Sequence, residues 1–133
     1  MVEIHAYSKA ASGGKQLSAH FKVREFACGD GSDAVLVAPR LVMVLQSIRS
    51  YFAAPVVIHS AYWTPQYNAK VGGAAHSQHC YGTAADISVK GQTPAAVAAY
   101  ARELMPDWGG VGVYAGQGFT HIDVRETRAD WTG

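Results

Sequence analysis

Cysteine is scarce in this sequence. Its 133 residues include two cysteines, Cys28 and Cys80, which excludes the dense disulfide framework of a small stapled domain. The composition is compatible with one disulfide bond or with two free thiols. Long hydrophobic runs are missing too, and none approaches the roughly 18 residues that a membrane-spanning helix requires. The first twenty residues carry polar and charged side chains throughout, without the apolar segment of a signal peptide.

Neither sign of charge is in excess. Eleven Lys and Arg residues against ten Asp and Glu residues give a formal net charge of +1. This balance excludes a broad basic surface, and with it the usual electrostatic basis for binding nucleic acid or acidic membranes. The length, and the absence of any Pro-, Gly- or Ser-rich linker, predict a single domain over residues 1–133.

One helix is clearly indicated over residues 39–52. It starts with a proline, which suits the first helical turn. Apolar residues then recur at helical spacing along the segment, namely Leu41, Val44, Leu45, Ile48 and Phe52. We expect this face to pack against the core.

The remaining pattern alternates strands with helices. The β-branched run of residues 56–58 predicts a buried strand, and residues 85–89, 111–114 and 119–124 predict three more. Thr93 is a suitable N-cap for a second helix that ends near Met105. Residues 60–82 contain Gly72 and Gly73 and no clear periodicity, which indicates a loop-rich segment. The sequence therefore predicts an α+β domain whose sheet is antiparallel in its C-terminal half.

Two histidines and one aspartate form the most informative group. His79 and Asp86 are seven residues apart, and a turn at Gly82 would bring them together. Alternation along the last predicted strand places His121 and Asp123 on one face, opposite the apolar Ile122 and Val124. Two imidazoles and one carboxylate are the ligand set of a catalytic zinc site that leaves a fourth position for water. The same residues are also common as hydrogen-bonded surface groups, so spacing alone leaves both interpretations open.

Several motifs resemble those of the D-alanyl-D-alanine zinc metallopeptidases, which share a fold with Hedgehog signalling domains. The central motif is Ser77-x-His79-x-x-Gly82-x-Ala84-x-Asp86, and the others, in order, are Ser60-Ala61-Tyr62, Thr64-Pro65 with Asn68, Val71-Gly72-Gly73 and residues 119–123. The similarity covers about residues 39–131 and is greatest to the short bacterial or phage enzymes that cleave cell walls. It implies a Hedgehog/D,D-peptidase-like fold with helices packed on one side of an antiparallel sheet. It also implies zinc binding by His79, Asp86 and His121, and a peptidoglycan peptide as substrate, cleaved by a carboxypeptidase or an endopeptidase. Without a signal peptide, we expect synthesis in the cytoplasm and another export or release route to the wall.

The general base of the family does not carry over to this sequence. Several relatives have a carboxylate three residues before the last zinc-binding histidine, where this chain has Gly118. Asp123 is our candidate for the catalytic base, because it shares a strand face with His121. An equally good role for Asp123 is to accept a hydrogen bond from a ligand imidazole and fix its tautomer. His76, three residues before His79, is a secondary candidate for the base, and the preferred alternative is a polar loop residue without a catalytic role.

Relatives usually carry an arginine where this chain has Trp63. Tryptophan lacks the planar fork of donors that a guanidinium offers to a carboxylate or an oxyanion. Arg125 is our candidate for a catalytic substitute, with a surface charge as the equal alternative. Trp63, Ser77 and Tyr62 are the candidates for substrate binding. The alternative is a zinc-containing module that binds peptidoglycan and is catalytically impaired.

Overall fold

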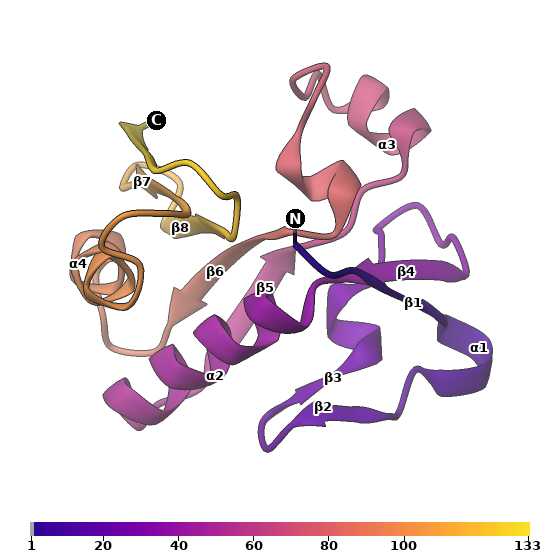
Figure 1. Cartoon of the computed structure of the whole chain (residues 1–133), viewed down its shortest axis with the longest axis horizontal. Helices are drawn as coiled ribbons and strands as arrows, with labels where there is room; N and C mark the ends of the chain where they lie inside the picture. Colours follow the sequence, from indigo (N-terminus) through magenta and orange to yellow (C-terminus); the bar gives the residue numbers. More distant parts are fainter. Residues whose placement is uncertain (1) are drawn as a thin grey trace.

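A five-stranded sheet forms the centre of the structure, a computed structural model that describes residues 2–133 (Figure 1). The elements in chain order are β1 (His5–Ser8), α1 (Lys9–Ser12), β2 (Gln16–Ser18), β3 (Phe21–Lys22), the 3-10 helix η1 (Val23–Phe26), β4 (Ala34–Val37), α2 (Pro39–Phe52), β5 (Val56–Ser60), α3 (Pro65–Lys70), the 3-10 helix η2 (Gln78–Tyr81), β6 (Ala84–Val89), α4 (Pro94–Leu104), β7 (Gly110–Tyr114), β8 (Phe119–Asp123) and β9 (Ala129–Thr132). The mixture of helices with small, mainly antiparallel sheets is compatible with the predicted α+β class.

The sheet has the strand order β5-β6-β8-β7-β9. The first three neighbouring pairs are antiparallel, as predicted, and β9 is parallel to β7. The expectation of an antiparallel C-terminal half is therefore correct for β7 and β8 and wrong for β9. After β8 the chain reverses over residues 124–128 and returns along the far edge of β7, so that it runs in the same direction as β7.

Two helices pack against this sheet. The predicted helix over residues 39–52 is confirmed as α2, and it contacts β6 and α4. The second predicted helix is confirmed as α4, where the Thr93 side chain accepts a hydrogen bond from Ala96 N at 3.1 Å. α4 contacts β6, β7 and β8, so that the buried faces of both helices contribute to one core. No helix within residues 2–133 has the length and apolar character needed to cross a bilayer.

The segment before α2 contributes short strands that the sequence did not indicate. β1 pairs with β4, and β2 pairs with β3, in two antiparallel ribbons. Phe21, Val23 and Phe26 from this segment are fully buried in the same core. Cys28 and Cys80 are both free thiols. The loop-rich segment of residues 60–82 also contains α3 and η2, which lie at one end of the sheet (Figure 1).

Gly82 makes the turn that leads from η2 into β6. The expected turn is present, and its φ of +76° is left-handed, a conformation that glycine adopts without steric cost. A Cβ atom at this position would lie 2.6 Å from Leu36 O and 2.7 Å from Leu36 C, both of which are backbone atoms of β4. Gly82 O also accepts a hydrogen bond from Ala38 N at 2.8 Å, at the start of α2. This tight turn fixes how His79 approaches β6.

We predict that Gly82→Ala lowers the free energy of unfolding by about 2–5 kcal/mol, since left-handed strain adds to the clash with the Leu36 backbone. Gly91→Ala is the matched control, because Gly91 has a φ of +79° and open space around a Cβ. It should cost only about 1 kcal/mol. Urea unfolding of both variants, with a chelator present, measures the difference. Equal losses would contradict the role assigned to the Leu36 contact.

Candidate metal centre

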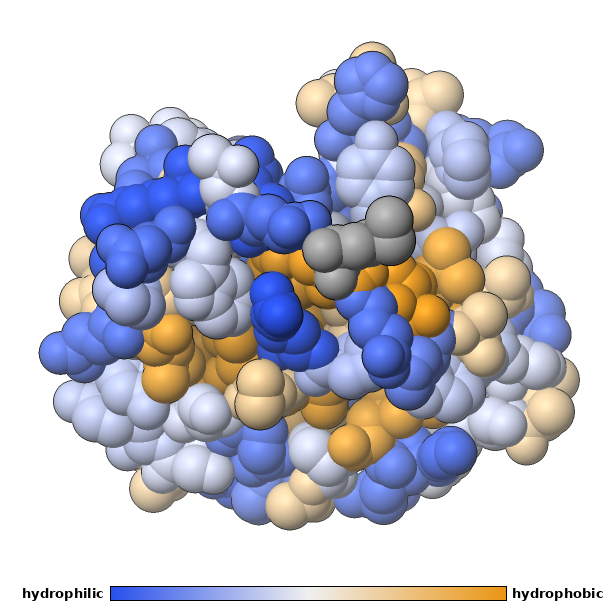
Figure 2. All heavy atoms as spheres, viewed as in Figure 1, coloured by the Kyte–Doolittle hydropathy of each residue, from blue (hydrophilic) through white to orange (hydrophobic). Residues whose placement is uncertain are grey.

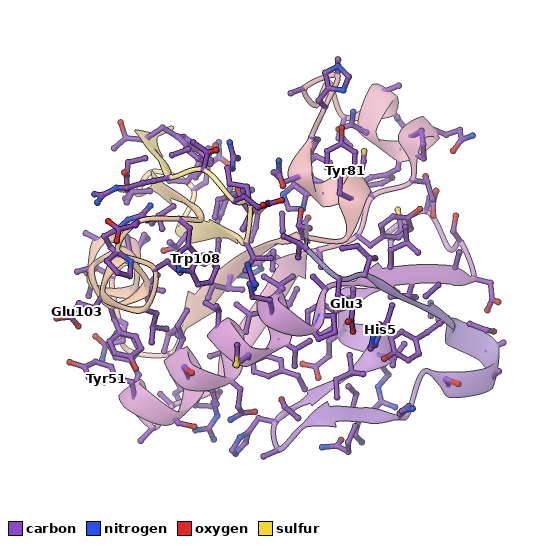
Figure 3. The ribbon with its side chains drawn as sticks, in the orientation of Figure 1. Glu3, His5, Tyr51, Tyr81, Glu103 and Trp108 are labelled. Carbon is purple, nitrogen blue, oxygen red and sulfur yellow. The ribbon has the colours of Figure 1, made fainter. Side chains whose placement is uncertain are left out.

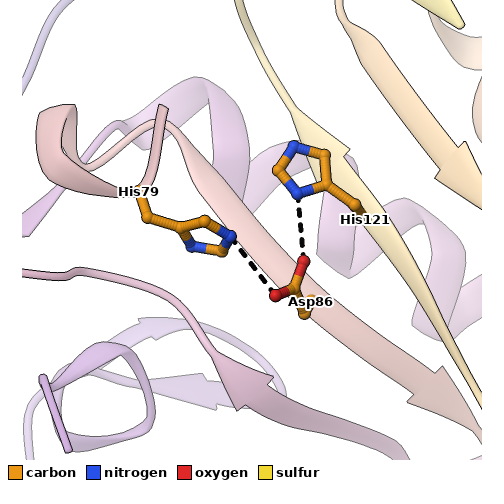
Figure 4. A group of neighbouring side chains, drawn as sticks. All are labelled: His79, Asp86 and His121. Carbon is orange, nitrogen blue, oxygen red and sulfur yellow. Dashed lines mark hydrogen bonds and ion pairs between the residues drawn. The ribbon is translucent and has the colours of Figure 1, made fainter. Parts of the chain in front are cut away.

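Asp86 and His121 form a direct cross-strand pair. The antiparallel register of β6 and β8 places them opposite each other, and side chains in such a pair lie on the same face of a sheet. His121 Nδ1 lies 3.0 Å from Asp86 Oδ1 (Figure 4). Both residues are at most 9% exposed. The register of the sheet therefore brings together two of the three predicted ligands.

His79 reaches the same point from η2. Ser77 caps this short helix by accepting a hydrogen bond from His79 N at 3.2 Å. The ring Nδ1 lies 2.6 Å from Ala61 O, to which it can only donate. This contact leaves Nε2 without a proton in the neutral ring, and Nε2 lies 3.3 Å from Asp86 Oδ2 (Figure 4). The tautomer of His79 is therefore fixed with a free lone pair facing Asp86.

The three residues meet the requirements of a metal site. One ligand atom from each of His79, Asp86 and His121 lies within 4.8 Å of the other two, and all three residues are buried. No other group of this kind occurs among residues 2–133. Two nitrogen ligands and one carboxylate oxygen are a donor set that suits zinc. The sequence identified each of these residues, and the structure brings them together.

Asp123 lies on the far side of the His121 ring. Its Oδ2 is 2.8 Å from His121 Nε2, and its Oδ1 accepts a hydrogen bond from Gly110 N at 3.0 Å. Arg125 donates to the same carboxylate through its backbone N, Nε and Nη2. With both oxygens engaged and no exposed surface, Asp123 has no path to a substrate. Of the two roles considered for Asp123, this geometry favours orienting the His121 ring over acting as the base.

Opposing effects set the pKa values of this group. Burial lowers the pKa of His121, but hydrogen bonds to Asp123 and Asp86 outweigh it and raise that pKa above its ordinary value. Burial raises the pKa of Asp86 and of Asp123, but hydrogen bonds, above all those from His121, outweigh it and lower both. Without a metal ion, His121 is thus stabilised as an imidazolium between two carboxylates. Coordination of a metal ion through Nδ1 would release that proton, so metal affinity would fall as the pH falls.

A cleft of about 420 Å³ opens onto the three residues. At the top of Figure 2 the surface is indented between the α3 segment and the C-terminal strands. The lining residues are Trp63, Gly73, Ala74, His76, Ser77, Gln78, His79, Asp86, Tyr114, Phe119, His121, Arg125 and Trp131. A larger hollow of about 540 Å³ is lined by residues of β1, β2 and α2, such as His5, which Figure 3 labels. It shares no lining residue with this cleft, and no ligand group within residues 2–133 lies in it.

The three candidates for substrate binding have different positions. Trp63 lines the cleft and stacks on the His79 ring, with centroids 4.0 Å apart and an angle of 18° between the planes. Ser77 also lines the cleft, where its hydroxyl is occupied as the cap of η2. Tyr62 is only 8% exposed and lies outside the lining, which argues against a contact with substrate. Burial raises its pKa.

Tyr114 and Trp131 line the cleft although sequence reasoning did not single them out. Trp131 lies against His121, with ring centroids 5.0 Å apart, and Arg125 lies 5.3 Å above the Trp131 ring. Trp131 belongs to β9, which no hydrophobic pattern indicated. Tyr114 ends β7 and stacks on Phe119 at 4.5 Å, directly across the hairpin. Alternation along the hairpin gives a weak signal for the pair of Tyr114 and Phe119. Nothing in the sequence predicts that β9 brings Trp131 next to this hairpin.

A protein-family model described as Peptidase M15 matches residues 13–123 of the chain. The matched region contains His79, Asp86 and His121, and it ends before Arg125 and Trp131. No curated protein is a significant match to the chain.

We predict that Asp123→Asn weakens zinc binding by about 10–100-fold. All the hydrogen-bonding groups around Asp123 are donors, so an amide NH₂ would face donors in either orientation. The zinc dissociation constant, measured by competition with a chromophoric chelator, checks this. Asp107→Asn, at an exposed position, is the control and should bind zinc as the unchanged protein does. An affinity unaltered in Asp123→Asn would contradict the orienting role.

Proposed function

The chain belongs to the peptidase M15 family, the D-alanyl-D-alanine zinc peptidases, and on that premise we propose that it hydrolyses peptide bonds of bacterial peptidoglycan with a zinc ion. The observation that carries this proposal is the buried group of His79, Asp86 and His121 inside the matched region. The order of the strands and helices is in keeping with a Hedgehog/D,D-peptidase-like fold, which forms part of the proposal.

The three ligands would hold zinc through His79 Nε2, an Asp86 oxygen and His121 Nδ1. When bound, zinc supplies a Lewis acid that polarises a carbonyl and activates water near neutral pH. The protein's own groups fix the orientation of the ligands: Ala61 O holds the His79 ring, and Asp123 holds the His121 ring. Trp63 covers one face of His79 and so limits access of solvent to that ligand.

In the proposed reaction the general base is His76. It lines the cleft and belongs neither to the ligand group nor to a pair with a buried carboxylate. Its Nδ1 lies 3.3 Å from the hydroxyl of Tyr81 on η2. A neutral imidazole can accept a proton from water and return it to the leaving amine. In the proposed reaction His76 has this role, while Asp123 orients His121.

A second function is favoured by two departures from the family pattern. Trp63 stands where relatives carry arginine, and Gly118 stands where several carry a catalytic carboxylate. A chain with both changes could bind zinc and peptidoglycan without hydrolysing it. Either function requires that the protein reach the cell wall by export or release.

Digestion of purified peptidoglycan separates the two functions. We predict that the zinc-loaded protein releases peptide fragments that mass spectrometry identifies. A chelator should stop the release and added zinc should restore it, while His121→Ala should abolish both zinc binding and release because it removes a ligand. Wall binding with bound zinc and no fragments would support the binding module instead. A protein that binds no zinc would contradict both functions.

We predict that His76→Ala lowers kcat by about 10²–10⁴-fold and leaves zinc content unchanged, because it removes the proton acceptor but no ligand. His59→Ala is the control, since His59 is an exposed histidine of β5 that lies outside the cleft and whose Nε2 lies 2.8 Å from Ser88 Oγ. Turnover of a synthetic stem peptide and zinc analysis of the same samples provide both readouts. Full turnover in His76→Ala would refute this assignment of the base.

A further inference from the structure

Asn68 is a buried polar residue of α3 that has no part in the metal centre. It is 7% exposed. Its side-chain Nδ2 donates a hydrogen bond to Ala74 O at 2.9 Å, and its backbone O accepts one from Gly73 N at 2.9 Å. Gly73 and Ala74 both line the cleft. Asn68 therefore holds two consecutive residues of the cleft wall.

The carbonyl that Asn68 holds also closes the turn that carries His76. Ser77 N donates to Ala74 O at 3.2 Å, which makes residues 74–77 a β-turn with His76 at the second of its two central positions. Ala74 O thus accepts two hydrogen bonds, one within the turn and one from Asn68. The second bond ties an otherwise local turn to α3.

α3 is itself anchored to a neighbouring loop. Thr64 caps the helix by accepting a hydrogen bond from Tyr67 N at 3.1 Å, and its hydroxyl donates to Asp30 Oδ2 at 2.8 Å. The Tyr67 hydroxyl lies against Gly29 in the same loop, where an added Cβ would be 3.3 Å from it. Thr64 therefore fixes the first turn of α3, and Asn68, whose N donates to Thr64 O, extends from a support that is already held.

Stability does not account for the Asn68 amide. Because a carbonyl oxygen can only accept, Nδ2 must face Ala74 O, and this orientation leaves Oδ1 buried without a hydrogen-bond partner among residues 2–133. A buried acceptor without a partner costs at least as much free energy as one ordinary hydrogen bond contributes. Gly73 makes room for the amide, since a Cβ there would lie 1.9 Å from Oδ1. The contact is thus kept although it adds little to the stability of the fold.

We propose that Asn68 is a positioning residue, which fixes the turn of residues 74–77 through Ala74 O and so holds the His76 imidazole at its place in the cleft. Asn68 belongs neither to the ligand group nor to the lining of the cleft, so it acts only through this turn. The role of His76 as the base rests on the proposed function, whereas the link from Asn68 to the turn rests on the hydrogen bonds alone.

Asn68→Leu tests the amide, because leucine has the branched shape of asparagine without its donor. We expect kcat for a synthetic stem peptide to fall about 10–100-fold with zinc content unchanged, since a small displacement of a catalytic group is costly. Asn68→Ala also removes the donor and should show a similar loss. Gln66→Ala changes an exposed amide on the same helix and should keep full turnover. Full turnover in both Asn68 variants would overturn the proposal.

A double-mutant cycle separates positioning from a general loss of structure. Asn68→Leu should have no further effect on kcat in the His76→Ala background, because the group that Asn68 positions is gone. The same loss in both backgrounds would show that Asn68 acts on the fold as a whole, and would remove the assignment.

NMR of the protein supplied with zinc gives a readout that does not depend on hydrolysis. The His76 Cε1–H resonance is identified by its loss in His76→Ala, and hydrogen exchange of the Ser77 amide reports on the turn. In Asn68→Leu we expect the His76 resonance to move toward that of an unstructured histidine. The Ser77 amide should exchange about three- to tenfold faster, as for one lost hydrogen bond. Gln66→Ala should change neither signal.

The NMR result and the turnover result have separate consequences. If both NMR signals in Asn68→Leu match those of the unchanged protein, the proposal is overturned. If both change as expected but the unchanged protein hydrolyses no peptide, the proposed function fails and the hold of Asn68 on the His76 turn stands.

Discussion

The position of His121 between two carboxylates is the constraint on which the rest of the site depends. Asp86 engages Nδ1 from the neighbouring strand, and Asp123 engages Nε2 from the same strand two residues on. Both carboxylates are buried, so neither could remain charged without these partners. A one-residue slip between β6 and β8 would move Asp86 to the opposite face and separate all three groups. The group of His121 and its two carboxylates therefore forms only in this register of the sheet.

The sequence predicts the parts of this arrangement that depend on local pattern. Apolar spacing identifies α2 and α4, and alternation along β8 places His121 and Asp123 on one face. The three ligands follow from the same alternation together with the ordered motifs. The parallel return of β9 does not follow from any pattern, because its four residues, Ala129 to Thr132, carry no hydrophobic run. The role of Asp123 does not follow from the sequence either, because only the contacts with Arg125 and His121 show that both of its oxygens are occupied.

The replacement of an expected arginine by Trp63 changes what the cleft can recognise. A guanidinium at that position would present charged donors to an anion, whereas the indole stacks on His79 and presents an apolar edge. Arg125 does not restore the lost charge, because Asp123 already pairs with it.

The space for the lining of the cleft comes from two glycines in β7. Gly110 lies opposite Asp123 in the β7–β8 register and Gly112 lies opposite His121. A Cβ on Gly110 would overlap the Asp123 carboxylate, and one on Gly112 would overlap the Trp131 indole. The absence of side chains at these alternate positions lets Asp123 and Trp131 approach His121 from two sides. The two glycines of β7 therefore permit both the contact of Asp123 with His121 and the position of the Trp131 ring in the cleft. In this way β9, although it lies outside the region matched by the family, contributes to the site.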